Sequence, residues 1–413
     1  MQRRSRATVF ANRGTNPLDV PARDPIVRRL LMREKVAIAG IGYTAFTSVS
    51  PGSSYRELTY EAAVKAYDEA GIEPKDVDSF ICTSEDFLEG YSISDEYCND
   101  QLGAVLKPAQ TIPGDFIHSL AVGMMHVLTE RFDIVVVQAL SKASNMKTIP
   151  EMINFALDPV LNRPLDITAY MVAGLEMNRF LAEERATRKQ CAAVVVKNKA
   201  NALLNPVAAY GARVSIDHVL DSEPIAEPVC LLDVAPYADG AVVMVLCSEK
   251  LAPSLSDRPV WINGVGWSSD SPTLESREWT DAVAVRLAGD MAYKMAGIAC
   301  PAKDVDLAEV NDEISFKELQ HLEALRLFDP GQAGKATEDG RTSPGGTLPV
   351  NVSGGGLGVG HLFECSGAQK VLELVLQLRG EAGERQVSDA SVGLAQAWRG
   401  IPSTSAAVAI LSN

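Results

Sequence analysis

The 413-residue chain lacks the features that mark several broad classes of protein. No uninterrupted apolar stretch approaches the roughly 20 residues that a membrane-spanning helix requires, so we expect no bilayer span. Basic residues are in deficit: 38 lysines and arginines against 53 acidic residues give a formal charge of −15, which argues against a nucleic-acid surface. The negative charge of the protein would repel an anionic substrate, which would therefore need a local basic pocket. The remaining composition, 46% hydrophobic and 22% charged, is ordinary for a globular protein with an ample core.

Paired cysteines are also missing. The seven cysteines are odd in number and dispersed, and none lies in a CxxC pair, so the sequence predicts neither a disulfide framework nor a zinc site within the chain. We expect a reducing, cytoplasmic compartment. The glycine run Gly354–Gly356 is not followed by Lys-Ser/Thr at P-loop spacing, which argues against a nucleotide phosphate cradle.

The first 31 residues differ from the rest of the chain. They are rich in arginine, contain only two acidic residues, Asp19 and Asp24, and have no continuous apolar run. These carboxylates and the nearby prolines do not suit an amphipathic targeting helix. We expect residues 1–31 to be a disordered or non-native extension, with the folded part starting at Met32.

Two stretches of the sequence repeat one another, which indicates a duplication. The run KVAIAGIGYTAFT (Lys35–Thr47) parallels PVWINGVGWSSDS (Pro259–Ser271), each with an apolar segment, a glycine pair and polar turn residues. A helical stretch follows each run. Then Ala66–Glu85 parallels Ala292–Glu313, where a glycine suited to a helix C-cap precedes Asp-Val-Asp and a short apolar strand. The chain is therefore predicted to be a duplicated β-α-β unit.

The repeat divides the chain into two halves, residues 32–258 and 259–413. Both halves contain apolar runs without alternation, such as IVVVQAL before Ser141, which is typical of strands covered on both faces. Alternating helices and buried strands predict a layered α/β fold. A region at about 141–228 holds helices and proline-containing loops, and we expect it to be a cap inserted in the first half.

The most informative segment is the glycine-rich run PVNVSGGGLGVGHLFECSGAQK (Pro349–Lys370). It places His361 and then Cys365 directly before an amphipathic stretch that favours a helix. A helix N-terminus stabilises negative charge, including a thiolate or an oxyanion, and glycines let the backbone approach a ligand. A histidine at this point can act as a base or donate to an oxyanion. The pattern favours acyl or carbon–carbon bond chemistry.

Three segments resemble the thiolase superfamily, in particular its sterol-carrier and archaeal types: KNKANALLNP (Lys197–Pro206), EPVCLLDVAPYADGAVVMVLCSEK (Glu227–Lys250) and GRTSPGGTLPVNVSGGGLGVGH (Gly340–His361). The resemblance extends over Lys35–Asn413. It implies an α/β fold of five layers, α-β-α-β-α, built from two pseudo-symmetric halves and usually found as an obligate homodimer. It also implies a reaction on acyl-CoA, with coenzyme A as a substrate and no covalently bound cofactor.

In this family, helix N-termini from the two halves face one another across the reaction centre. His361 matches the histidine of the family's GHP motif, and Asn311 in VNDEIS matches a second His or Asn. The nucleophile position departs from the family, because Phe116, or Asp115 after a small shift, stands where cysteine is expected. The position near the chain end that carries Cys or His falls at about Gln396. An ordinary thiolase assignment therefore fails at its main residue.

Two explanations of the missing cysteine stay open. In the first, the nucleophile is Cys365 of the second half instead of a cysteine in the first half, and the helix N-terminus and His361 activate it. Against this, Cys365 would equally serve as a small packing residue, and Glu364 would oppose a thiolate. In the second, there is no covalent intermediate, as in thiolase-like retro-aldolases that need only an oxyanion site and a base for a β-hydroxyl. His361, Asn311 and Asp115 are candidates for those roles, although Asp115 would equally serve as a helix N-cap.

The resemblance predicts thiolytic carbon–carbon cleavage of a 3-oxoacyl-CoA. A retro-aldol lyase acting on a 3-hydroxyacyl-CoA is the alternative, and a degenerate CoA-ester-binding scaffold is a third hypothesis. Thiolase homologues without the loop cysteine resemble proteins that work with a small zinc-ribbon and OB-fold subunit. This suggests such a partner, and benzoylsuccinyl-CoA, cleaved to benzoyl-CoA and succinyl-CoA, as one substrate. For contacts with CoA we expect four residues of the glycine-rich run: Ser353, Gly355, Gly356 and Gly360.

The remaining histidines have less specific contexts. We expect His118 and His126, which follow the nucleophile loop, to be core or interface residues. His218 and His321 have charged neighbours in the sequence, and we expect both to face solvent.

Overall fold

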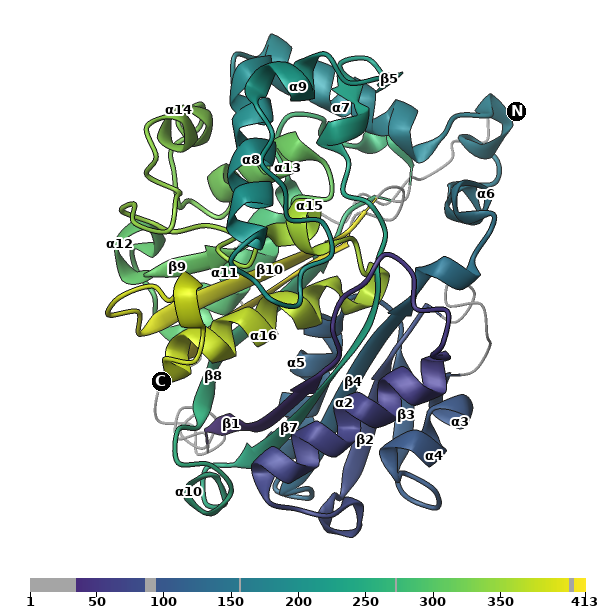
Figure 1. Cartoon of the computed structure of the whole chain (residues 1–413), viewed down its shortest axis with the longest axis vertical. Coiled ribbons are helices and arrows are strands. Elements are labelled where there is room, and N and C mark those ends of the chain that lie inside the picture. Colours follow the sequence, from purple (N-terminus) through teal and green to yellow (C-terminus); the bar gives the residue numbers. More distant parts are fainter. Residues whose placement is uncertain (1–34, 86–93, 156, 272, 401–404) are drawn as a thin grey trace, which may run out of the picture. The chain divides into compact units, whose positions relative to one another are not determined.

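The computed structural model describes residues 35–85, 94–155, 157–271, 273–400 and 405–413 (Figure 1). Residues Lys35–Asn413 form one compact unit. The predicted extension, residues 1–31, lies outside the described residues. In the described part of the chain, no helix combines the length and the apolar character needed to cross a membrane.

Nine strands form one sheet in the order β3-β2-β4-β7-β1-β8-β11-β10-β9. The strands are β1 (Val36–Tyr43), β2 (Ser79–Thr83), β3 (Ala109–Ile112), β4 (Ile134–Lys142), β7 (Asp239–Ser248), β8 (Val260–Ser269), β9 (Leu307–Glu309), β10 (Val392–Arg399) and β11 (Ser405–Ser412). β1 and β8 join the two parts of the sheet through the antiparallel pairs Ala37–Trp261 and Ile38–Val260. Outward from this junction, the order β1-β7-β4-β2 recurs as β8-β11-β10-β9. This repetition confirms an α/β fold with two pseudo-symmetric halves.

The first half has one further strand at its edge. β3 pairs in parallel with β2, with Ala109 opposite Phe80. At the corresponding place in the second half, Val350 forms an isolated parallel bridge with Ala308 of β9. The glycine-rich segment that follows Val350 therefore starts beside β9, at the edge of the sheet.

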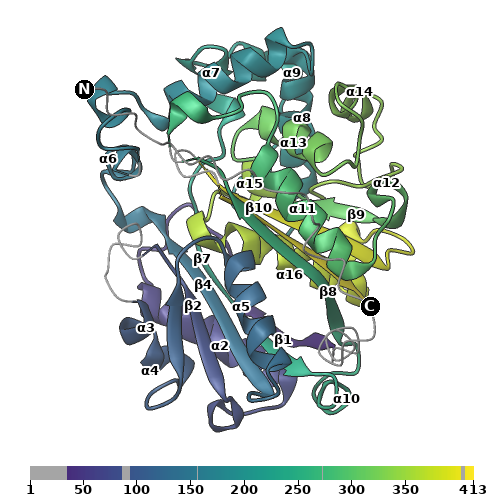
Figure 2. The same cartoon turned by 180° about the vertical axis from the view of Figure 1, so that it is seen from behind.

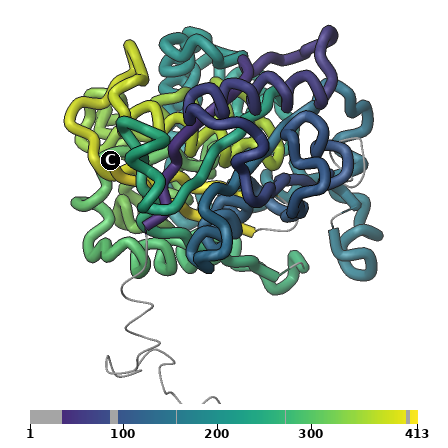
Figure 3. Tube along the Cα trace, turned by 90° about the horizontal axis from the view of Figure 1, so that it is seen from below, coloured from purple at the N-terminus to yellow at the C-terminus, as the bar shows by residue number. Residues whose placement is uncertain are grey.

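Helices cover both parts of the sheet on two faces. α5 (Phe116–Leu128) and α16 (Ser366–Arg379) contact each other in a central core that also takes side chains from the strands of both halves. α2 (Tyr55–Ala70) packs on the outer face of the first half, and α11 (Val283–Ala296) on that of the second (Figures 1 and 2). The succession of α2, strands, α5 with α16, strands and α11 gives the five layers that the resemblance implies. Figure 3 shows the purple-to-blue first half and the green-to-yellow second half side by side.

The glycine pairs of the sequence repeat lie under the outer helices. A Cβ on Gly42 would lie 1.9 Å from the carbonyl oxygen of Ala62 in α2, and one on Gly266 would lie 2.1 Å from that of Ala288 in α11. The missing side chains let each outer helix rest directly on its strand. A glycine in the left-handed conformation ends each of these helices, as the sequence predicts.

The chain between β4 and β7 carries four helices and a small hairpin, and it contains most of the region at about 141–228. The elements are α6 (Ile149–Asn154), α7 (Ala169–Ala182), α8 (Arg188–Ala202), α9 (Ile216–Leu220), β5 (Pro224–Ala226) and β6 (Val229–Cys230). α8 packs against α13 (Ser315–Ala324), α14 (Ala333–Glu338) and α15 (Gly355–Val359), so it supports the glycine-rich segment. Shorter helices are α3 (Ser94–Tyr97), α4 (Asn99–Leu102), α10 (Ala252–Leu255) and α12 (Pro301–Asp304). The limits given for the halves and the insertion stay predictions.

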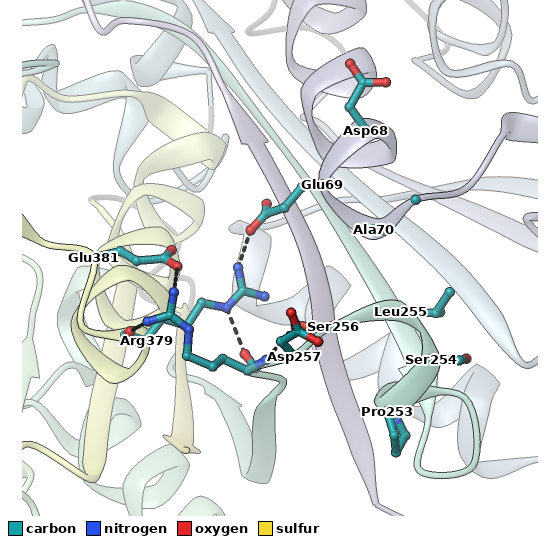
Figure 4. A pocket seen from close by; sticks show the side chains of 12 residues that line it. Asp68, Glu69, Ala70, Pro253, Ser254, Leu255, Ser256, Asp257, Arg379 and Glu381 are labelled. Carbon is teal, nitrogen blue, oxygen red and sulfur yellow. Dashed lines mark hydrogen bonds and ion pairs between the residues drawn. The ribbon is translucent and has the colours of Figure 1, made fainter.

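Arg379 clamps the two halves together near the β1–β8 junction (Figure 4). From the end of α16, its Nη2 donates to the backbone carbonyls of Ile38 at 3.2 Å and Ala39 at 3.1 Å. Its Nη1 forms an ion pair with Glu69 of α2, and its Nε donates to the carbonyl of Arg258 at 3.0 Å. These charge-assisted bonds tie a central helix of the second half to the first strand and the outer helix of the first half.

Candidate active site

The glycine-rich segment is organised around a buried carboxylate. Asp312, which follows β9, accepts from the backbone N–H of Gly356 at 2.6 Å and of Leu357 at 3.2 Å. These amides belong to the first turn of α15, so Asp312 caps that helix from another part of the chain. A Cβ on Gly355 would lie 2.2 Å from Asp312 Oδ2, which explains a glycine with φ of +57° at that position. Sequence reasoning did not single out Asp312, although it lies in the VNDEIS motif.

The conspicuous run KNKANALLNP also serves this segment. Its side chains donate to four carbonyls between Val350 and Leu357: Lys197 to Val350 (2.7 Å), Asn201 to Asn351 (3.0 Å), Asn205 to Ser353 (2.9 Å) and Lys199 to Leu357 (3.0 Å). Asn198 donates to Asp312 at 2.8 Å. The lysines and asparagines of α8 thus fix the backbone that leads to His361.

The four residues expected to contact CoA have partners within the protein. Ser353 Oγ donates to Glu309 Oε2 at 2.6 Å, and Gly360 N–H donates to the carbonyl of Gly356 at 2.9 Å. Gly355 and Gly356 lie against Asp312, and all four residues are buried. The structure favours a structural role for them, and their contact with CoA stays a prediction.

His361 lies where the glycine-rich segment meets a stretch of chain before β7. Its N–H donates to the carbonyl of Pro236 at 2.7 Å, and its carbonyl accepts from Ala238 N–H at 3.0 Å. The half-buried imidazole lies between two aromatic rings, with centroid distances of 5.3 Å to Tyr237 and 5.3 Å to Phe363. Among the described residues it has no side-chain hydrogen-bond partner. Its backbone is fixed and its ring nitrogens are available to a ligand.

Tyr237 connects His361 to a small cavity of about 30 Å³. The cavity is lined by Pro150, Ile153, Thr168, Ala169, Tyr170, Tyr237, Glu313, Ile314 and Trp398. The ring of Tyr237 stacks on Phe363 with centroids 4.9 Å apart. Burial raises the pKa of both Tyr237 and Tyr170, and the neighbouring Glu313 raises both further, so the phenols keep their protons at neutral pH. Glu313 Oε2 is buried without a hydrogen-bond partner in the described chain. A carboxylate beside two phenols is suited to proton transfer.

The structure brings together Asn311 and Gln396, two residues expected at the site. The N–H of Asn311 donates to Gln396 Oε1 at 2.9 Å, and its Nδ2 donates to the carbonyl of Trp398 at 3.2 Å. Its Oδ1 accepts from the N–H of Glu313 at 3.1 Å. Asn311 therefore fixes the backbone of Glu313, whose side chain lines the cavity. The carbonyl of Asn311 accepts from His321 Nδ1 at 3.1 Å. His321 is fully buried, so the expectation that it faces solvent is wrong.

Asp115 bonds to the N-termini of both central helices. Its Oδ1 accepts from Ile117 N–H at 3.0 Å, as a helix N-cap, and its Oδ2 accepts from Gly367 N–H of α16 at 2.8 Å. Burial raises the pKa of Asp115 to about 7, and the charge of Glu364 acts in the same direction. Phe116, the first residue of α5, is fully buried in the central core. One carboxylate therefore accepts from one amide at the N-terminus of each central helix, where an anion is stabilised.

Cys365 is enclosed by protein. It ends the 3₁₀ turn Phe363–Cys365, directly before α16, and its exposed fraction is 0% within the central core. It does not line the cavity beside Tyr237, and neither does any other cysteine of the described chain. This burial favours the packing role, while the nucleophile assignment stays a prediction. The described residues hold no cluster of three or more His, Cys, Asp and Glu side chains placed to bind a metal ion.

His118 is a half-buried imidazole one turn into α5. Its Nδ1 lies 3.2 Å from the carbonyl of Asp115 and must carry the proton, because a carbonyl only accepts. Burial lowers the pKa of His118 to about 4, and nearby Arg399 lowers it further. Arg399 forms an ion pair with Glu85. This ion pair lies at the ends of β2 and β10.

Known proteins resemble this chain over most of its length. Residues 266–413 match the family described as thiolase C-terminal domain-like. The acetyl-CoA acetyltransferase of Methanothermobacter thermautotrophicus is 32% identical over 379 residues, covering 90% of this chain and 98% of that protein. The 17-hydroxy-3-oxo-4-pregnene-20-carboxyl-CoA lyase of Mycobacterium tuberculosis is 30% identical over 390 residues, covering 91% and 99%.

A solved structure, the Ltp2-ChsH2(DUF35) aldolase, contains a chain of the same fold. It superposes with a TM-score of 0.79 at 27% identity, and the match covers 92% of this chain and 97% of that one. These relatives support chemistry of the thiolase type on CoA esters. On the matched sequence, the repeated strand order and the five layers, the chain belongs to the thiolase family.

Proposed function

We propose that this protein cleaves a carbon–carbon bond in a 3-hydroxyacyl-CoA by a retro-aldol reaction, as a lyase. The observation that carries the proposal is the cavity beside His361, which holds Glu313 and two phenols but no cysteine among its lining residues. The 30% identity to a CoA-thioester lyase and the fold shared with an aldolase support it.

In the proposed reaction, Glu313 accepts the proton of the β-hydroxyl group. The bond between Cα and Cβ then breaks, Cβ becomes a ketone or aldehyde carbon, and the electron pair forms a thioester enolate. A ring N–H of His361 donates to the enolate oxygen. The proton held by Glu313 passes to Cα, which gives a shortened acyl-CoA and balances the reaction without an added reactant.

The remaining groups fit supporting roles. Tyr237 keeps its phenol proton, so it can donate to the oxygen on Cβ and bring the substrate between Glu313 and His361. Asn311 is a positioning residue, because its side chain bonds to the N–H of Glu313 and to the carbonyl of Trp398. Positioned acid–base groups typically contribute about 10²- to 10⁴-fold to a rate.

Thiolysis of a 3-oxoacyl-CoA, for instance benzoylsuccinyl-CoA, is the second candidate. Two observations favour it: the 32% identity to an acetyltransferase, and the position of Cys365 directly before α16. It requires the buried thiol to become accessible, to attack the 3-oxo carbon, and to release the acyl group to CoA.

The name of the aldolase structure joins two components, and we propose that this chain also works with a small zinc-ribbon and OB-fold subunit. A homodimer of this chain is proposed as well. A scaffold without catalysis is disfavoured, because burying Glu313 Oε2 beside two phenols is costly unless the groups are used.

The test separates the two reactions. The chain, with and without its co-expressed small subunit, is incubated with a 3-hydroxyacyl-CoA in the absence of free CoA, and the products are identified by mass spectrometry. A carbonyl compound and a shortened acyl-CoA support the lyase. Two acyl-CoA products from a 3-oxoacyl-CoA plus free CoA, with no cleavage of the 3-hydroxy substrate, would replace it with thiolysis.

A further inference from the structure

Three buried charged side chains lie outside the residues that line the cavity, and one of them, Lys317, lies against the ring of Trp398. They are Arg277, which follows the 3₁₀ turn Leu274–Ser276, Glu176 of α7 and Lys317 of α13. Their exposed fractions are 7%, 4% and 1%. Charges so deeply buried need partners, because removing an ion from water costs several kcal/mol.

Lys317 has its partners in Glu176 and Gln320. Lys317 Nζ donates to Glu176 Oε1 at 2.5 Å and to Gln320 Oε1 at 2.8 Å, and it lies 4.3 Å from the ring centroid of Trp398. Burial lowers the pKa of Lys317 to about 8, and Arg277 is among the charges that lower it further. A second cation therefore lies within electrostatic reach of this pair.

Arg277 is the charge left over. Its Nη1 and Nη2 are both buried and have no acceptor among the described residues, and Glu176 Oε2 likewise has no donor. The ring of Trp279, 5.8 Å from the guanidinium carbon, is its aromatic neighbour. Buried polar groups in folded proteins are nearly always hydrogen-bonded, so a guanidinium with two vacant Nη groups indicates an occupant.

The two helices that line the cavity lead to this cluster. Ala169 of α7 lines the cavity, and Glu176 lies seven residues later on the same helical face, roughly 10 Å along the axis. Ile314 also lines the cavity, and Lys317 follows it within one turn at the start of α13. Trp398 lines the cavity, and its ring forms a cation–π contact with Lys317. Glu176 and Lys317 therefore lie on α7 and α13 just beyond the residues that line the cavity, and Arg277 is close enough to act on the charge of Lys317.

We propose that Arg277 is an oxyanion-binding subsite that takes a carboxylate on the acyl chain of the substrate. That the ligand is part of a CoA-linked substrate rests on the proposed function. That it is an anion rests on the buried guanidinium without an acceptor. A guanidinium offers a planar fork that matches a carboxylate with two parallel hydrogen bonds. Because Glu176 neutralises Lys317, Arg277 supplies the net positive charge that an anionic chain needs in a protein of formal charge −15.

Substrate preference tests the subsite. Two 3-hydroxyacyl-CoA substrates that differ only at the chain end, a free carboxylate and its methyl ester, are compared with wild type, Arg277→Met and Arg286→Met. Arg286 is exposed on α11 and serves as the control. We expect the wild type and the control to prefer the carboxylate by about ten-fold or more in kcat/KM, and Arg277→Met to lose that preference. Equal use of both substrates by the wild type would overturn the subsite, whereas cleavage of neither would overturn the proposed function alone.

A binding measurement decides the subsite without catalysis. Thermal unfolding is followed with increasing glutarate or succinate, and with their neutral dimethyl esters. We expect the dicarboxylates to raise the Tm of the wild type and of Arg286→Met but not of Arg277→Met. Without ligand, Arg277→Met should be as stable as the wild type or more so, because it removes an uncompensated buried charge. A lowered Tm in that variant, with no response of the wild type to either anion, would show that Arg277 holds only buried water.

Discussion

The two central helices begin at equivalent places in the two halves, but their first residues do different work. α5 begins after Asp115, whose carboxylate accepts from amides at the N-termini of both α5 and α16. α16 begins after Cys365, which makes no side-chain cap and lies at 0% exposure in the central core. One carboxylate thus bonds to the N-termini of both helices and links the two halves. The negative charge that these helix ends favour is supplied here by Asp115.

The ends of β2 and β9 give a second pair of equivalent positions. In the sequence repeat, Glu85 of the first half aligns with Glu313 of the second. Glu85 is held in an ion pair with Arg399, whereas Glu313 carries a buried oxygen without a hydrogen-bond partner in the described chain and faces Tyr237. The carboxylate at this position is neutralised in one half and has an unpaired oxygen in the other. Under the proposed function, the reaction would take place on the side of the second half.

The largest effect should come from Glu313→Gln. The amide keeps the shape but cannot accept a proton, so we expect kcat on a 3-hydroxyacyl-CoA to fall by about 10²- to 10⁴-fold. The equivalent change Glu85→Gln is the control and should cost far less, because that carboxylate neutralises Arg399. Steady-state rates of both variants measure the difference. Equal losses would mean that the two positions are not used differently.

Removing the shared cap should have the next largest effect. Asp115→Ala leaves two buried amides, Ile117 N–H and Gly367 N–H, without an acceptor, and we expect the free energy of unfolding to fall by about 2–4 kcal/mol. Asp115→Asn keeps one acceptor and should lose about half as much. Urea unfolding of both variants measures this order. A loss in Asp115→Ala no larger than that of an exposed N-cap such as Ser54→Ala, about 1 kcal/mol, would contradict the double-cap role.

Much of this arrangement follows from local sequence rules. The repeat and the C-cap glycines are confirmed, because each depends on a few neighbouring residues and on helix or strand geometry. Asp115 as an N-cap was one of two sequence-based alternatives, and the structure shows the cap. Its bond to Gly367 joins residues 252 positions apart and has no local signal.

Burial is what the sequence did not reveal. α13 contains Lys317, Glu318 and Glu323, which made His321 look solvent-facing, yet the helix is buried and its charges are paired with residues of α7, α8 and neighbouring loops. The VNDEIS motif drew attention to Asn311, while Glu313 in the same motif was not singled out. Its burial depends on residues from 75 or more positions away, including Tyr237 and Tyr170. A polar segment can be recognised as buried only when its distant partners are known.

The stability of the protein should depend on pH through the carboxyl group of Asp115, which has no counterpart at Cys365 before α16. Burial raises the pKa of Asp115 to about 7 in the folded protein, against roughly 3.9 in an unfolded chain. Between these values the unfolded state holds fewer protons, so this group's contribution is fully present below about pH 4 and is lost as pH rises through about 7. We expect the Tm of the wild type to fall relative to that of Asp115→Asn between pH 5 and 8. A constant difference between the two would show that Asp115 titrates normally.

The smallest effect is expected at Cys365. If the thiol is a packing group, Cys365→Ala removes one buried sulfur atom and should cost about 1 kcal/mol of unfolding free energy, with retro-aldol turnover kept within about two-fold. Intact mass spectrometry of the wild type under turnover should then show no acyl adduct. An adduct that disappears in Cys365→Ala, together with a loss of activity above about 100-fold, would identify Cys365 as the nucleophile. That result would also require the central core to open, since no thiol at 0% exposure can reach a thioester while the strands of both halves enclose it.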